Sequence, residues 1–174
     1  MGFLKIAEIK ALIKDVPNFP KPGIIFKDIT PIFETRNAFV SLMHEFEKKV
    51  PTEITRIVAI ESRGFIFGSA LSLKTGIPFS LVRKKGKLPR PTHSKSYELE
   101  YGLDELFIHK DSLKSSDSVL VIDDVLATGG TAKAVEDLCL MSDVKMISSL
   151  FFIELSFLNG KQKLKHPSDS LISY

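Results

Sequence analysis

Two adjacent carboxylates followed by a glycine-rich turn are the strongest chemical signal in this sequence. Asp123 and Asp124 come directly after the apolar run 119–122. The turn that follows contains Ala127, Thr128, Gly129, Gly130 and Thr131. Backbone N–H groups in such a turn can bind an anion, and glycine lets the chain approach a ligand closely. Carboxylates accept hydrogen bonds from sugar hydroxyls but repel phosphate. The pattern therefore predicts a ribose bound by the two aspartates, with its 5'-phosphate in the 127–131 turn.

Other glycine-rich phosphate motifs fit this stretch less well. A nucleotide P-loop has a Lys and then Ser or Thr after the second glycine of a longer loop, whereas Thr131 and Ala132 follow Gly130 here. The G-x-G-x-x-G spacing of dinucleotide-binding turns does not match either. The alternative without a ligand is an Asp-Asp turn with a glycine-rich loop that ends a strand.

Two further segments suit an anion. Glu61-Ser62-Arg63-Gly64 lies between the apolar run 56–60 and a helical pattern. The planar guanidinium of Arg63 matches phosphate oxygens, although it can also pair with Glu61 at the surface. Residues 83–96 carry six Lys or Arg and no acidic residue. This segment favours a flexible loop that closes over a polyanion and excludes water, with a solvated basic loop as the alternative.

The elements that must position these residues alternate between strands and helices. Apolar runs predict buried strands at 56–60, 79–82, 119–122 and 145–153, and helical spacing predicts helices at 3–14, about 35–50, 65–74 and about 132–142. This alternation predicts an α/β domain with a mainly parallel sheet. Right-handed crossovers place the strand-to-helix turns at one edge, so 61–64 and 127–131 are expected to face one crevice. The proline-containing segment 19–31 is expected to be rigid and extended. The last dozen residues are expected to form a short polar tail, from which Leu171, Ile172 and Tyr174 can pack back on the domain.

Composition limits the class of protein. With 174 residues, 44% of them hydrophobic, the chain is expected to form one domain, 1–174. The net charge of +3 suits an anionic small molecule, and no dense basic stripe indicates nucleic-acid binding. No apolar run is long enough to span a bilayer. Cys139, the only cysteine, falls on an apolar helix face. It is interpreted as a buried thiol, not a nucleophile, and a cytoplasmic location is expected.

The stretch from Asp123 to Thr131 resembles the phosphoribosyl pyrophosphate (PRPP) fingerprint of type I phosphoribosyltransferases. Other segments narrow the resemblance to the adenine phosphoribosyltransferases, over roughly Phe19 to Lys163. The resemblance implies the type I phosphoribosyltransferase fold, a mainly parallel central sheet flanked by helices. Residues 1–34 would form a hood over the active site and 83–96 a flexible lid. It also implies transfer of the 5-phosphoribosyl group from PRPP to N9 of adenine, giving AMP and pyrophosphate.

The family resemblance also assigns roles to individual residues. The 19–31 segment is similar to the family's adenine pocket, so Phe26 would stack on the ring while the main chain of Ile25 and Lys27 reads its edge. From the residues alone, a proline-rich connector is the simpler interpretation. The resemblance implies Arg83 and Lys87 as pyrophosphate ligands alongside Arg63. Lys84 is a further candidate, and Arg83 would also have a catalytic role.

The segment Leu99-Glu100-Tyr101-Gly102 is similar to a family motif. It implies that Glu100 is the acid/base residue near N7 of adenine and that Tyr101 is its neighbour. Without the resemblance, Glu100 is a solvent-facing carboxylate. The family further implies Mg²⁺ bound mainly through PRPP and water, with no direct protein ligand, and a homodimer in which Arg83 can reach the neighbouring subunit's site.

Two alternatives stay open at this stage. A different phosphoribosyltransferase would share the 123–131 motif but read hypoxanthine, guanine, xanthine or orotate, and segments 23–31 and 97–102 discriminate between them. A non-catalytic nucleotide-binding regulator of transcription would keep the motif but require a DNA-binding surface, which the sequence does not indicate.

Overall fold

The computed structural model describes residues 2–98 and 103–174. The chain forms two compact units, Met1–Lys48 and Lys49–Tyr174. Each is described by itself. In the described part of the chain, no helix is both long and apolar enough to cross a membrane.

The first unit combines three short helices with a hairpin. Its elements are α1 (Ile6–Leu12), β1 (Lys14–Pro17), β2 (Ile25–Asp28), α2 (Thr30–Glu34) and α3 (Ala38–Lys48). Strands β1 and β2 pair antiparallel, with Pro17 opposite Ile25. The expectation of a wholly extended 19–31 segment is therefore wrong. Pro31 lies in the first turn of α2, where its missing N–H breaks no helical hydrogen bond. Thr35 ends α2 and does not cap the next helix, which begins at Ala38.

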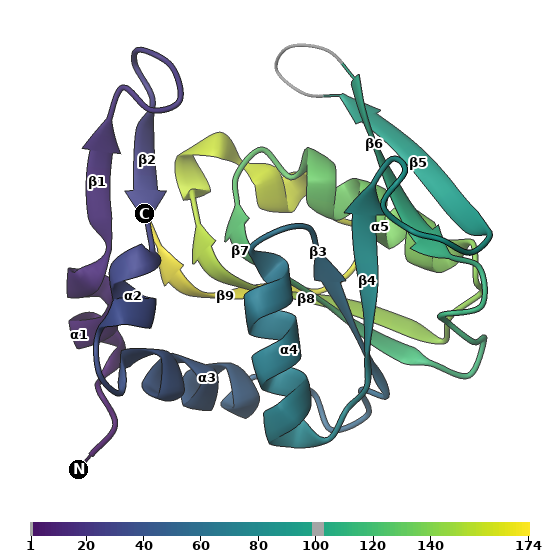
Figure 1. Cartoon of the computed structure of the whole chain (residues 1–174), viewed down its shortest axis with the longest axis horizontal. Coiled ribbons are helices and arrows are strands. Elements are labelled where there is room, and N and C mark those ends of the chain that lie inside the picture. The colour runs from purple at the N-terminus through teal and green to yellow at the C-terminus, as the bar shows by residue number, and fades with distance from the viewer. Residues whose placement is uncertain (1, 99–102) are drawn as a thin grey trace. The chain divides into compact units, whose positions relative to one another are not determined.

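The second unit contains a seven-stranded sheet with the order β5-β6-β4-β3-β7-β8-β9 (Figure 1). Its strands are β3 (Arg56–Ile60), β4 (Phe79–Lys84), β5 (Thr92–Glu98), β6 (Leu103–His109), β7 (Ser118–Leu126), β8 (Met146–Glu154) and β9 (Ser168–Ser173). In this order, all neighbouring strands from β4 to β9 pair parallel. Strand β6 pairs antiparallel with both β4 and β5. The predicted α/β fold with a mainly parallel sheet is confirmed.

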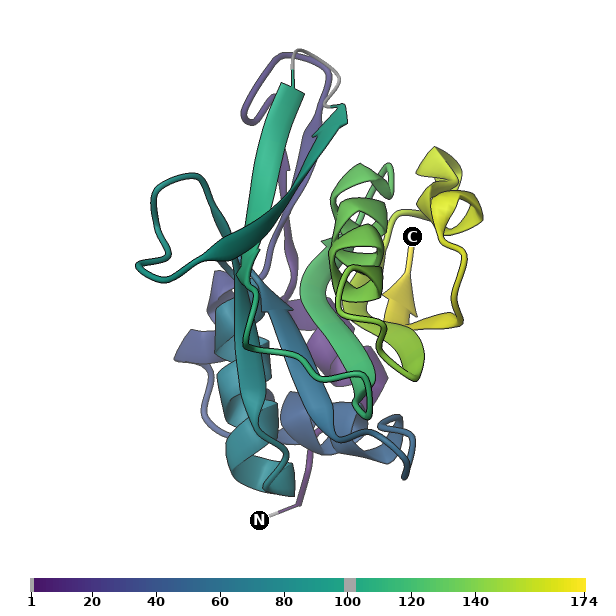
Figure 2. The same ribbon diagram turned by 90° about the vertical axis from the view of Figure 1, so that its right-hand side faces the viewer.

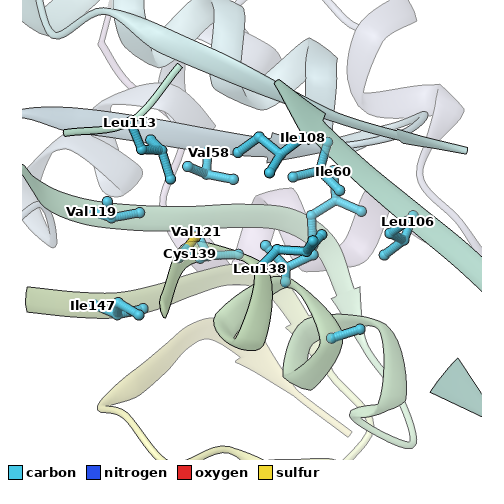
Figure 3. Close-up of a cluster of buried hydrophobic side chains, with 13 residues drawn as sticks. Val58, Ile60, Leu106, Ile108, Leu113, Val119, Val121, Leu138, Cys139 and Ile147 are labelled. Carbon is cyan, nitrogen blue, oxygen red and sulfur yellow. The ribbon is translucent and has the colours of Figure 1, made fainter. Parts of the chain in front are cut away.

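Helices α4 (Gly64–Thr75) and α5 (Gly130–Leu140) cover opposite faces of this sheet (Figure 2). Val58 and Val121 pack towards Leu138 and Cys139 of α5 in a buried cluster (Figure 3). On the other face α4 comes so close that a Cβ on Gly68 would lie 2.6 Å from Ala59 Cβ. Burial on both faces explains the uninterrupted apolar runs, because successive side chains point to opposite faces.

Three boundaries in the second unit differ from the predictions. Strand β7 continues through the two aspartates to Leu126, because β8 keeps pairing with it up to Leu126 opposite Glu154. Residues 168–173 form the edge strand β9, not a polar tail, and Ile172 is buried against the sheet. The basic segment 83–96 is shorter as a loop than expected. Its ends belong to β4 and β5, which both pair with β6, so only 85–91 lies outside the strands.

Candidate functional site

The two predicted anion-binding turns meet at the carboxyl ends of neighbouring strands. The 61–64 turn follows β3, and the 127–131 turn follows β7, which lies beside β3. Strand β4 lies on the other side of β3, so this edge is a point where the strand order reverses, a common ligand site in open α/β sheets. A Cβ on Gly64 would lie 2.9 Å from both Asp123 Oδ1 and the Ile122 carbonyl oxygen. Glycine at this position therefore lets the 61–64 turn contact the end of β7 that bears the aspartates.

The two aspartates at the end of β7 are contacted by the 61–64 turn and by their own backbone. Arg63 Nε lies 2.7 Å from Asp124 Oδ2, and the Asp124 side chain is only 7% exposed. Asp123 Oδ1 accepts a hydrogen bond from the Asp124 N–H at 2.9 Å. No described residue donates a well-aligned hydrogen bond to Asp124 Oδ2, so the contact with Arg63 is an ion pair. That oxygen keeps the capacity to accept a hydrogen bond from a ligand hydroxyl.

Burial is the main cause that raises the pKa of Asp123 well above its ordinary value, and the neighbouring Asp124 carboxylate raises it further. The hydrogen bond from the Asp124 N–H and the charge of Arg63 lower it, but only in part. The fold thus places two carboxyl groups side by side, where burial and the second carboxyl both oppose ionisation of Asp123. Such crowding is typical of sites that bind a cationic or hydroxyl-rich ligand and not of sites built for stability.

We expect Asp123→Asn to be more stable than the wild type at pH 7.5. A carboxyl whose pKa is higher in the folded state destabilises the fold above its unfolded-state pKa, and this cost disappears as the pH falls below that value. The gain should therefore vanish near pH 3.5. Thermal denaturation at the two pH values measures it, with roughly 2–4 °C in Tm for each kcal/mol gained.

Asp117→Asn is the matched control, because Asp117 is a buried aspartate just before the other end of β7. It accepts hydrogen bonds from Thr55 Oγ1 and the Lys114 N–H. Its replacement should lower Tm at pH 7.5. A Tm for Asp123→Asn at or below that of the wild type would show that attraction to Arg63 outweighs burial and repulsion.

The glycine-rich turn encloses a small cavity. Residues 127–131 line it together with Asp123 and Phe151, and its volume is about 80 Å³. Gly129 adopts a left-handed φ of 79° and α5 begins at the next residue. The N–H groups of the turn and the positive end of the α5 dipole therefore favour an anion in this cavity. The side chain of Thr131 also lies within hydrogen-bonding reach of Tyr97 on β5.

Glu61 gathers the cationic groups near the β3 turn. Its Oε1 lies 3.1 Å from Arg83 Nη2 and 4.0 Å from Lys87 Nζ, and its Oε2 accepts the Lys84 N–H at 2.8 Å. Burial tends to raise the pKa of Glu61, but the Lys84 N–H and the Arg83 guanidinium outweigh burial and hold it below its ordinary value. The alternative in which Arg63 pairs with Glu61 is replaced by two separate pairs, Arg63 with Asp124 and Arg83 with Glu61.

Comparison with known proteins gives the family of this chain. A family model described as the phosphoribosyl transferase domain matches residues 32–171. An adenine phosphoribosyltransferase of Carboxydothermus hydrogenoformans is 51% identical over 160 residues, covering 90% of this chain and 93% of the relative. This chain belongs to the adenine phosphoribosyltransferase family. Members of the family transfer the phosphoribosyl group of PRPP to adenine, giving AMP and pyrophosphate.

Solved structures of adenine phosphoribosyltransferases share this fold. The enzyme of Thermoanaerobacter pseudethanolicus superposes with a TM-score of 0.94 at 43% identity, covering 98% of this chain and all of the other. The Saccharomyces cerevisiae enzyme, solved with D-2,5-dideoxy-2,5-imino-altritol 1,6-bisphosphate and adenine, gives a TM-score of 0.90 at 38% identity, with 95% and 97% coverage.

The residues expected to read adenine in this phosphoribosyltransferase lie together on β2 of the first unit. The Ile25 side chain is exposed, and the Phe26 ring packs edge-on against Phe19 with centroids 5.1 Å apart. Lys27 Nζ lies 2.6 Å from Asp15 Oδ1. Asp15 of β1 thus orders Lys27, and Phe19 in the connection between β1 and β2 orders Phe26.

Several site residues were missed or cannot be placed. Sequence patterns gave no role to Tyr97 or Glu61, although both contact predicted ligand-binding residues. Glu100 and Tyr101 lie outside the described residues, so their roles stay predictions. Cys139 is buried as predicted, and burial raises the pKa of its thiol to about 12, which keeps it protonated and unreactive.

Proposed function

We propose that this chain forms AMP from PRPP and adenine at the carboxyl edge of its sheet. The observation that carries this proposal is the contact between the 61–64 turn and the end of β7 that bears the two aspartates and leads into the 127–131 turn. A carboxylate pair suited to ribose hydroxyls, a glycine turn suited to the 5'-phosphate and a guanidinium suited to pyrophosphate meet within one group of side chains. These are the chemical parts of PRPP, in an order that matches its covalent structure.

The proposed mechanism starts with capture of the ribose 5-phosphate. The 127–131 turn binds the 5'-phosphate, and the binding energy of this remote group orients the reacting carbon. Asp123 and Asp124 accept hydrogen bonds from the ribose hydroxyls. Their negative charge lies beside the oxocarbenium-like centre that forms as the bond to pyrophosphate breaks. The raised pKa of Asp123 in the free site fits this role, because a nearby positive charge favours its ionised form.

The pyrophosphate leaving group requires cations, and we assign Arg63, Arg83 and Lys87 to it. In the free protein each of these side chains faces a carboxylate. Arg83 also lies 5.7 Å over the Phe65 ring, and its Nη1 donates to the Lys87 carbonyl at 3.2 Å. Pyrophosphate binding would exchange these intramolecular partners for phosphate oxygens, and the 85–91 loop supplies the required movement.

Adenine recognition is assigned to Ile25, Phe26 and Lys27, and acid/base catalysis at N7 to Glu100.

The family model begins at residue 32 and runs to 171, across the boundary between the two compact units. This supports a single phosphoribosyltransferase domain, in which residues 1–34 form the hood.

Mg²⁺ is proposed to enter with PRPP. Within residues 2–98 and 103–174 no group of three or more His, Cys, Asp or Glu side chains is arranged to hold a metal ion. PRPP oxygens and water would supply the ligands of the ion, with no direct protein ligand, because Mg²⁺ dehydrates reluctantly and keeps several waters when it binds with phosphates. When bound, the ion supplies charge neutralisation on the leaving pyrophosphate.

A homodimer and a cytoplasmic location are proposed as well. On α4, Ile66 and Leu73 lie two turns apart on one face and are 39% and 89% exposed. Apolar side chains of this size on one surface are typical of an interface with a second subunit. The mass of the protein in solution tests this.

The buried, reduced thiol of Cys139 suits a reducing compartment.

The test of function is to mix the protein with PRPP, Mg²⁺ and a single base and to measure nucleotide formation. We expect AMP from adenine and no product from hypoxanthine, guanine, xanthine or orotate. Removal of Mg²⁺ with EDTA should stop the reaction, and added Mg²⁺ should restore it. Product from another base would reassign the substrate. Nucleic-acid binding without any nucleotide product would favour the regulator.

A further inference from the structure

Gly160, in a turn near the C-terminus, touches the back of the 127–131 turn. It begins the short helix η2 (Gly160–Lys163), which follows η1 (Ser156–Leu158). A Cβ on Gly160 would lie 2.0 Å from the Ala127 carbonyl oxygen and 2.8 Å from Gly129 N. In the reverse direction, a Cβ on Gly129 would lie 2.2 Å from the Gly160 carbonyl oxygen. The two main chains are thus in direct contact, with no room for a side chain on either.

The segment that carries Gly160 is fixed on both sides of this contact. Before it, the Leu155 N–H donates to the Leu126 carbonyl at 2.9 Å, at the end of β7. After it, Leu164 packs against Leu126, Ala132 and Phe151. The buried Glu136 carboxylate of α5 then accepts the N–H groups of Lys165 and His166 at 3.0 and 3.3 Å. These contacts tie the turn to the strand before the anion cavity and to the helix after it.

We propose that Gly160 is a positioning residue for the proposed 5'-phosphate site: its main chain sets the place of Ala127 and Gly129, so that the N–H groups of their turn converge on the phosphate. The inference rests on the proposed function. Relieving the 2.0 Å approach requires the turn to move by about 1 Å, since Cβ contacts below 3.0 Å essentially do not occur. Hydrogen-bond donors displaced by that much no longer match the ligand.

Gly160→Ala is the test. Gly160 does not have a left-handed φ, unlike Gly129, where that φ would strain any side chain. The substitution at Gly160 therefore introduces a contact without an unfavourable φ. Titration calorimetry should show affinity for ribose 5-phosphate falling by about 10–100-fold, the scale expected for a 1 Å misplacement. Affinity for pyrophosphate should stay within a factor of about two, since its proposed ligands lie on other segments. In assays the KM for PRPP should rise much more than kcat falls.

Gly68→Ala is the matched control. Its Cβ would lie 2.6 Å from Ala59 Cβ in the core. It should lower Tm without changing the ratio of the two affinities. If Gly160→Ala does not fold, Leu164→Ala replaces it, because it loosens the same segment without a clash. This variant should lose ribose 5-phosphate affinity selectively.

A folded Gly160→Ala protein with unchanged ribose 5-phosphate affinity would overturn the inference, as would equal losses for both ligands. If Leu164→Ala is tested instead, unchanged ribose 5-phosphate affinity or equal losses for both ligands would likewise overturn the inference. Wild-type protein that does not bind ribose 5-phosphate would instead overturn the proposed phosphate site, so the two failures are distinguishable.

Discussion

Replacing Asp123 and Asp124 together with asparagine is expected to lower kcat/KM for PRPP on the order of 10²–10⁴-fold, because two charge-assisted hydrogen bonds of about 1.5–3 kcal/mol each are weakened. Asparagine keeps the size of both side chains and the acceptor for the Asp124 N–H, but it removes the charge that faces Arg63, so Tm is measured alongside the activity. The negative charge next to the developing ribosyl cation is lost. Initial rates of AMP formation at saturating adenine, with PRPP varied, measure the effect.

The control for this double variant is again Asp117→Asn, which removes a buried carboxylate outside the site. It should reduce Tm and leave the KM for PRPP within about twofold, as expected for a distant, independent position. A double variant with unchanged PRPP affinity would refute the ribose assignment. Asp123→Asn alone should increase stability at neutral pH, so a loss of activity in that single variant cannot be ascribed to unfolding.

Glu100→Gln is expected to lower kcat by roughly 10²–10⁴-fold, the usual contribution of general acid–base catalysis. The KM for PRPP should change little, because the proposed role of Glu100 concerns N7 of adenine. The limb of the pH profile that reports Glu100 should also disappear. Glu105→Gln on β6 provides a carboxylate control that should keep both kcat and the pH profile. Unchanged turnover in Glu100→Gln would remove this residue from the mechanism.

The cationic side chains of the proposed site each face a carboxylate. Arg63 faces Asp124, Arg83 and Lys87 face Glu61, and Lys84 Nζ lies 2.9 Å from Asp104 Oδ2. These pairs keep the cations ordered without a polyanion present. They also mean that pyrophosphate gains less than the bare number of positive charges suggests, because each existing pair must first be broken.

Local patterns predicted what depends on neighbouring residues in the chain. The apolar run 119–122 and the glycine turn predicted the strand and the helix start in one stretch, since strand burial, turn geometry and helix initiation are short-range properties. The same holds for the 56–64 stretch. The family motif was equally local, which is why the activity followed from a few segments.

Boundaries and partners depended on pairing across the sheet. Nothing in the polar composition of 168–173 indicates an edge strand, and only its parallel pairing with β8 makes it one. Likewise, β6 converts the two ends of the basic segment into strands, although their side chains indicate a loop.

From the sequence alone came the α/β class, the ligand chemistry and most of the candidate residues, because each is encoded within a dozen consecutive positions. Only the tertiary structure brought Arg63 to Asp124, Glu61 to Arg83 and Gly160 to the back of the 127–131 turn. Arg63 and Asp124 are 61 residues apart in the sequence, Glu61 and Arg83 are 22 apart, and Gly160 is 31 to 33 residues from the turn that it contacts. These contacts form because sheet order and helix packing bring distant segments together.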